Sequence, residues 1–115
     1  MHSDKKKYFV CTLENLAKSD CFGVDIVVNE ATAQYFLIYH KNTIFSYLNR
    51  CPHTGVNLDW VAHQFLDRNH EFIQCATHGA LFSIKEGLCL RGPCVGDKLQ
   101  IVENVVFEGN IYLIL

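Results

Sequence analysis

The chain has 115 residues, half of them hydrophobic and 19% charged, and its formal net charge is −2. This length fits one compact domain and leaves no room for a second of ordinary size, so we expect a single domain over residues 1–115. The charge balance argues against a nucleic-acid-binding surface, and no apolar window is long enough to span a bilayer.

A basic run, Lys5-Lys6-Lys7, opens the chain and fits either a signal peptide or a solvated leader to the first strand. The apolar stretch behind it, Tyr8–Cys11, is too short for the hydrophobic region of a signal peptide. We therefore expect a leader and a cytoplasmic protein.

Short apolar and β-branched runs recur along the whole chain, separated by turns rich in Asn, Gly, Asp and Lys. Many short strands joined in this way predict an all-β sandwich or barrel. The runs are Tyr8–Cys11, Val24–Val28, Tyr35–Tyr39, Ile44–Leu48, Phe72–Cys75, Leu81–Ile84, Leu99–Val102, Val105–Phe107 and Ile111–Leu115; the turns are Asn29-Glu30, Lys41-Asn42, Lys85-Glu86-Gly87 and Glu108-Gly109-Asn110.

Helical periodicity is confined to short segments. Leu13 and Leu16 fit one helical turn, and Leu58–Leu66 fits either a second short helix or an irregular loop packed by Trp60 and Phe65. Asp67–His70 reads as a polar turn before the next strand.

The six cysteines of this short chain suggest either a disulfide framework or metal binding. A disulfide framework fits poorly with a reducing cytosol. We expect Cys11 and Cys21 to be reduced, partly buried thiols. Cys89 and Cys94 are close enough in sequence for a disulfide, but reduced thiols are again the expected state.

Two boxes combine cysteine with histidine: Cys51-Pro52-His53-Thr54-Gly55 and Cys75-Ala76-Thr77-His78-Gly79. Each follows a strand-like run, so each would place one thiolate and one imidazole on a loop at a strand end. These donors suit zinc in a Cys₂His₂ site or iron in a [2Fe–2S] cluster. A zinc finger usually takes its thiolates from one knuckle and its histidines from a helix, which is not the arrangement here. His63 and His70 are expected to be surface residues.

The boxes resemble the Rieske family, whose pattern is Cys-x-His, an intervening segment and Cys-x-x-His. The resemblance implies a [2Fe–2S] cluster in which Cys51 and Cys75 bind one iron and His53 and His78 bind the other. The 21 residues between His53 and Cys75 are towards the long end of the family's spacing and indicate an inserted loop.

The flanks are similar to those of the soluble Rieske ferredoxins. Ala80-Leu81-Phe82 follows the second box as it does there, and Gly92-Pro93-Cys94 corresponds to the proline loop that covers the cluster. The resemblance implies an all-β Rieske fold of three antiparallel sheets, with a cluster-binding subdomain formed by two ligand loops.

Four positions depart from the high-potential respiratory members of the family. Val56 and Thr77 stand where those proteins have a disulfide, and Ala80 and Phe82 stand where they have a serine and a tyrosine that donate to the cluster sulfurs. Fewer hydrogen bonds leave the reduced cluster less stabilised, so we expect a potential in the low part of the Rieske range.

A low potential implies a ferredoxin-like carrier that takes one electron from a flavin reductase and passes it to an oxygenase, without catalysis of its own. Only 21 residues follow Cys94, too few for the catalytic domain of a complete Rieske oxygenase. A redox or iron–sulfur sensor, a small subunit of a nitrite-reductase type of enzyme and a zinc-binding interaction module remain as alternatives. The oligomeric state is left open.

Overall fold

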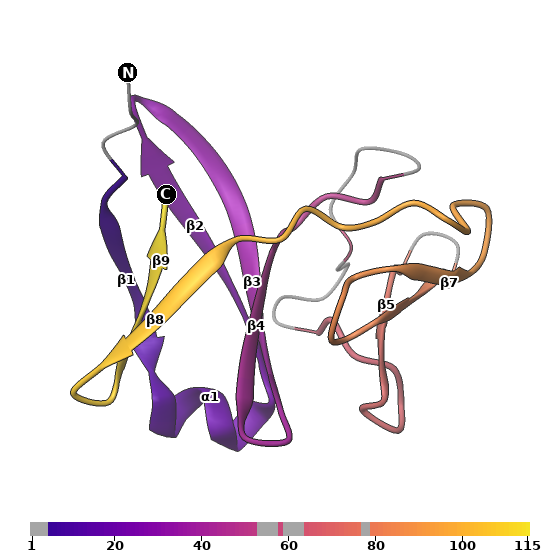
Figure 1. Ribbon diagram of the computed structural model, residues 1–115, viewed down its shortest axis with the longest axis horizontal. Coiled ribbons are helices and arrows are strands. Elements are labelled where there is room, and N and C mark those ends of the chain that lie inside the picture. The colour runs from indigo at the N-terminus through magenta and orange to yellow at the C-terminus, as the bar shows by residue number, and fades with distance from the viewer. Residues whose placement is uncertain (1–4, 53–57, 59–63, 77–78) are drawn as a thin grey trace.

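The computed structural model describes residues 5–52, 58, 64–76 and 79–115 (Figure 1). Within these ranges the strands form three antiparallel sheets with the orders β1-β9-β8, β2-β3-β4 and β5-β6-β7. The predicted all-β fold of three antiparallel sheets is therefore confirmed. The strands are β1 (Lys7–Thr12), β2 (Cys21–Val28), β3 (Ala31–His40), β4 (Thr43–Leu48), β5 (Phe72–Gln74), β6 (Leu81–Ser83), β7 (Cys89–Arg91), β8 (Glu103–Phe107) and β9 (Asn110–Ile114).

Three hairpins are closed by two-residue turns in which both residues have a positive φ. Such turns match the right-handed twist of the flanking strands, and Asn and Gly accept the conformation most easily. The turns are Asn29-Glu30, Lys41-Asn42 and Glu108-Gly109, with φ between 50° and 77°. All three lie where the sequence predicted turns.

One short helix, α1 (Leu13–Ser19), connects the first two sheets. Its first turn is capped by Thr12, whose hydroxyl accepts a hydrogen bond from the backbone N–H of Asn15 at 3.2 Å. The helix ends at Asp20, which has a φ of 69° and donates its N–H to the carbonyl of Leu16 at 2.8 Å. The helical turn predicted at Leu13 and Leu16 is thus confirmed, and Leu16 is fully buried.

Strand β3 is covered on both faces, because its four central residues, Tyr35 to Ile38, are all buried. Alternate side chains of a strand point to opposite faces. Accordingly Tyr35 and Leu37 belong to a core shared with β1, β9 and α1, while Phe36 and Ile38 belong to a second core shared with the third sheet. The central sheet therefore lies between the two cores, with β3 as its middle strand.

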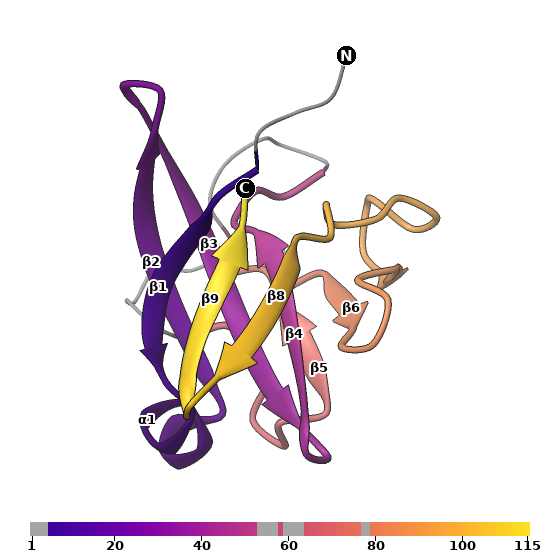
Figure 2. The same ribbon diagram turned by 60° about the vertical axis from the view of Figure 1, so that its left-hand side comes forward.

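The third sheet, β5-β6-β7, lies beside the other two in both views, with the chain crossing to it after β4 and returning before β8 (Figures 1 and 2). No helix in the described ranges is both long enough and apolar enough to cross a membrane.

One strand prediction was wrong, and one strand was not predicted. Leu99–Val102 forms no strand: it follows β4 through the hydrogen bonds Leu48 N–H to Gln100 O and Val102 N–H to Ser46 O, with a single bridge at Ile101. This segment is the return crossing between two sheets, and it contacts β4 too briefly to form a ladder. Conversely, β7 was not predicted, because Cys89–Arg91 contains no β-branched residue.

Candidate functional site

The described residues of the second cysteine box, Cys75, Ala76 and Gly79, follow the end of β5. The N–H of Cys75 donates to the carbonyl of Ala80, and the N–H of Gly79 donates to the carbonyl of Cys75, both at 2.9 Å. Gly79 has a φ of +66°, which favours glycine at this position. These bonds fix the backbone on both sides of Cys75, whose side chain is fully buried.

The first box follows β4. Asn49 donates its N–H to the carbonyl of Gln34 on β3, and Arg50 donates its N–H to the carbonyl of Leu48, at 2.8 and 2.9 Å. The chain is therefore held to the central sheet until just before Cys51, which is 1% exposed.

The two boxes are connected through Leu58. The buried side chain of Asn49 accepts a hydrogen bond from the N–H of Leu58 at 2.8 Å. The carbonyl of Leu58 in turn accepts from the N–H of Ala76, next to Cys75, at 2.7 Å. Because Asn49 and Ala76 each lie within two residues of a box cysteine, these two bonds connect the backbone near Cys51 with the backbone near Cys75. Asn49 was not predicted as a site residue. The only sequence signal for it is its position immediately before Arg50-Cys51.

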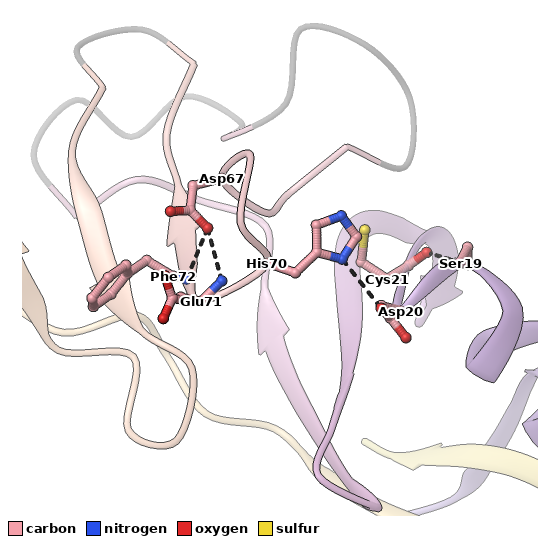
Figure 3. Close-up of polar contacts among 7 residues, drawn as sticks. All are labelled: Ser19, Asp20, Cys21, Asp67, His70, Glu71 and Phe72. Atoms are coloured by element: carbon pink, nitrogen blue, oxygen red, sulfur yellow. Dashed lines mark hydrogen bonds and ion pairs between the residues drawn. The ribbon is translucent and has the colours of Figure 1, made fainter.

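A polar turn fixes the start of β5, as predicted (Figure 3). Asp67 Oδ1 accepts from the N–H groups of Glu71 and Phe72 at 2.9 and 3.1 Å. Nδ1 of His70 lies 3.2 Å from Oδ2 of Asp20 at the end of α1, and both side chains are about half exposed. His70 is the surface residue that we expected, and its contact ties the turn to the first half of the molecule.

Cys51 and Cys75 belong to the same buried core. The other two predicted ligands, His53 and His78, lie outside the described residues, as do Val56, Thr77, Trp60 and His63. Within the described part of the chain no three His, Cys, Asp or Glu side chains are arranged to hold a metal ion.

The predicted proline loop packs against the second box. A Cβ added to Gly92 would lie 2.9 Å from Cβ and 3.0 Å from Cα of Ala80, so only glycine allows this approach. Ala80 is also the residue whose carbonyl holds the N–H of Cys75 at 2.9 Å. The turn at Gly92 therefore contacts the residue, Ala80, that is hydrogen-bonded to the predicted ligand Cys75.

Three further cysteines, Cys21, Cys89 and Cys94, lie in the core that contains Cys51 and Cys75, and two of them form a pair. The thiol of Cys94 donates to the sulfur of Cys89 across 2.7 Å, and none of the six cysteines forms a disulfide in the structure. Burial raises the pKa of Cys94 to about 12, and the hydrogen bond to Cys89 and the nearby charges of Cys89 and Cys51 act in the same direction. Cys94 thus keeps its proton at neutral pH.

Solved structures similar to this one share its fold. The ferredoxin of carbazole 1,9a-dioxygenase from Nocardioides aromaticivorans IC177 aligns over 94% of this chain and 96% of its own, with a TM-score of 0.70 and 19% identity. A chain of the complex of reduced oxygenase and oxidized ferredoxin in carbazole 1,9a-dioxygenase aligns over 94% and 92%, also with a TM-score of 0.70 and 19% identity. The putative NADH-dependent nitrite reductase small subunit from Mycobacterium tuberculosis aligns over 98% and 97%, with a TM-score of 0.67 and 19% identity.

No curated protein sequence matches the chain. The family model described as "Rieske [2Fe-2S] domain" matches residues 6–105, and this range includes both boxes, the proline loop, strands β1 to β7 and the start of β8. A [2Fe–2S] cluster is the cofactor that this family implies. The chain belongs to the Rieske [2Fe-2S] domain family.

Proposed function

We propose that the chain is a one-electron carrier whose [2Fe–2S] cluster is bound by Cys51, His53, Cys75 and His78. The observation that carries this proposal is the connection between the boxes: both cysteines are buried in one core, and Leu58 links their loops by hydrogen bonds. A carrier of this kind needs a cofactor site and a docking surface, and it needs no substrate pocket.

The donor set fits the cluster. Two thiolates from different loops can bind one iron, and the imidazoles of the same boxes provide the donors for the other. When bound, the cluster takes up and releases one electron. Replacing two of four thiolates by neutral imidazoles makes that uptake easier than in an all-cysteine cluster.

The chain's own residues position the ligands and exclude water. Cys51 and Cys75 are 1% and 0% exposed, so solvent does not reach their sulfur atoms. The hydrogen bonds from Cys75 to Ala80 and from Leu58 to Asn49 fix the loops. A site held in this way keeps the same ligand geometry in both oxidation states.

Partner docking is proposed at the cluster end of the third sheet. Leu90 on β7 and Val95 on the turn that follows it are 49% and 64% exposed although both are apolar. Small, weak interfaces are typical of redox encounters. The likeness to a chain of an oxygenase–ferredoxin complex supports an oxygenase as acceptor and a flavin reductase as donor. We place this exchange in the cytoplasm.

A second candidate is a small subunit of a nitrite-reductase type of enzyme, and the alignment with the Mycobacterium tuberculosis protein over 98% of this chain favours it. The two roles differ in stoichiometry. A carrier exchanges electrons in brief encounters, whereas a subunit stays bound to its catalytic partner. Gel filtration with each partner distinguishes them: co-elution at one-to-one stoichiometry supports the subunit.

The cluster is tested by iron and sulfide analysis and by EPR of anaerobically purified protein, before and after dithionite. We expect equal amounts of iron and acid-labile sulfide and a Rieske-type signal with a low average g in the reduced sample. Stoichiometric zinc without sulfide would overturn the proposal in favour of a zinc-binding module.

The ligands are tested by substitution. Cys51→Ser and Cys75→Ser should each abolish the signal, because one iron loses a thiolate. Cys11→Ser is the matched control, since Cys11 is also buried but belongs to the other core. His70→Ala should keep the cluster as well, because His70 bonds to Asp20 on the surface. Retention of the cluster in either box variant contradicts the assignment.

A further inference from the structure

Cys89 and Cys94 form a close pair of thiols. Their sulfur atoms are 2.7 Å apart, about 0.7 Å more than the length of a disulfide bond, so the sulfurs need to approach each other only by about that distance to form the bond. The side chains are 1% and 2% exposed. None of the residues proposed to bind the cluster belongs to this pair.

The backbone holds the two cysteines in this position. Cys89 donates its N–H to the carbonyl of Asp97 at 2.8 Å and accepts from the N–H of Gly96 at 3.3 Å. Asp97 donates its N–H to the carbonyl of Cys94 at 2.8 Å. These three bonds close the loop from both sides, so the sulfurs face each other without any contribution from the cluster.

Oxidation would cost the pair little in hydrogen bonding. The Cys94 thiol donates to Cys89, and the Cys89 thiol donates to the carbonyl of Arg91 at 3.5 Å. Arg91 is exposed, so water can replace that second donor once the thiol protons have left.

The pair is within reach of small oxidants although its sulfurs are buried. Every residue between the two cysteines, from Leu90 to Pro93, is exposed, and so are Val95 and Gly96 behind Cys94. Local opening of this segment, which includes the short edge strand β7, would bring the sulfurs to solvent without unfolding of the other two sheets.

The pair also encloses the turn that packs on the second box. Gly92 lies between the two cysteines in sequence, and its backbone approaches Ala80 so closely that an added Cβ would be 2.9 Å away. A covalent bond between Cys89 and Cys94 would fix this turn against the backbone that holds Cys75.

We propose that Cys89 and Cys94 are a second redox site, a reversible dithiol that small disulfides oxidise, and that closing it fixes the Gly92 turn on the second box. The step transfers two electrons. One thiol, after losing its proton, attacks a sulfur of the small disulfide and releases one thiolate. The other thiol then loses its proton and attacks the mixed disulfide, which forms the Cys89–Cys94 bond and releases the second thiolate. The two protons leave with the two released thiolates, so the small disulfide is reduced to two thiols.

The test uses the cluster-loaded protein, reduced and then incubated anaerobically with oxidised glutathione. After acid quenching and alkylation, four of the six cysteines should be alkylated, and peptide mapping should identify a Cys89–Cys94 link. Oxidation of the pair should need about a tenfold lower glutathione disulfide-to-thiol ratio than mixed-disulfide formation at Cys11 or Cys21, because the second thiol is intramolecular. Dithiothreitol should restore six alkylated cysteines.

Cys94→Ser should form no internal link, whereas the matched control Cys21→Ser should still form it. The EPR signal is recorded in parallel, and linking of the pair without loss of the signal supports the proposal. If the pair stays reduced while the signal persists, if other cysteines link first, or if linking requires cluster loss, the proposal is overturned. The effect on the turn is measured by the rate at which a chelator removes iron. We expect it to fall several-fold in the linked form, and an unchanged rate refutes the coupling to the second box.

Discussion

Gly92→Ala tests the packing of the proline loop on the second box. Gly92 has a φ of +111°, and the added methyl group would meet Ala80 at 2.9 Å from its Cβ and 3.0 Å from its Cα. The same turn contains a matched control. Gly96 has a φ of +96°, but an added Cβ would have no atom within 4 Å. The two substitutions share the backbone strain and differ in the contact.

The expected losses follow from these two terms. A positive φ costs a residue with a Cβ about 1–2 kcal/mol. Ordinary contacts between carbon atoms are about 3.5–4.0 Å, so the alanine at position 92 also overpacks its site, which costs roughly 1–3 kcal/mol more. We therefore expect Gly96→Ala to lower the free energy of unfolding by about 1–2 kcal/mol and Gly92→Ala by about 2–5 kcal/mol.

The assay is urea unfolding of the anaerobic protein, followed by far-ultraviolet circular dichroism and by the visible absorption of the cluster. The Ala80 backbone moved by Gly92→Ala holds Cys75, so the absorption should be lost at a lower urea concentration than in the Gly96→Ala protein. Equal losses in the two variants would refute the reasoning, since the contact with Ala80 would then contribute nothing.

Further predictions concern the potential and the core. Ala80→Ser and Phe82→Tyr each add a hydroxyl beside the second box, and both should raise the reduction potential, with the double variant highest. Voltammetry at a pH well below the histidine titration measures these potentials. A parent potential near the top of the roughly −150 to +300 mV span contradicts the expected low potential. Tyr47→Phe should lower the free energy of unfolding by about 1–2 kcal/mol, because the buried hydroxyl donates to the carbonyl of Ile84 at 2.5 Å. Burial, with a smaller effect of Glu86, raises the pKa of Tyr47 from 10.0 to about 12. The Tyr47 hydroxyl therefore ionises at a lower pH in the unfolded chain than in the folded one. The stabilisation is complete below pH 10 and is lost as the pH rises through about 12. The difference between wild type and Tyr47→Phe in unfolding experiments should therefore shrink over that range, and a constant difference would contradict the assignment.

Local features of the fold could be predicted because their causes are local. Asn29-Glu30 and Lys41-Asn42 join alternating apolar runs, and a two-residue turn fixes the register of the hairpin around it. Leu13 and Leu16 likewise signalled α1, whose cap and C-terminal turn lie within a few residues. The failure at Leu99–Val102 concerns contact with a distant strand, β4, which no short sequence window contains. Strand β7 was missed for another reason, because Cys89–Arg91 has no β-branched residue although its partner β6 is near in sequence.

The candidate site divides in the same way. The order Cys-x-His and Cys-x-x-His predicted the donor types and the cluster, because ligand chemistry depends on side-chain identity and close spacing. His53 and His78 remain predicted ligands. The residues that connect the boxes, Asn49 and Leu58, could not be predicted, since neither the Asn49 side chain nor the Leu58 backbone has a sequence signature of its partner.

The sequence by itself determined which groups are available for chemistry: two thiolates, two imidazoles and a loop with Gly92 at its start. Only the tertiary structure decided that Cys51 and Cys75 share one core, that Gly92 packs on Ala80, and that Cys94 faces Cys89 across 2.7 Å. The reason is physical. Covalent chemistry and turn preferences act over a few residues. These contacts instead depend on how the other two sheets pack on the sheet that contains β3, a strand whose alternate side chains are buried in two different cores.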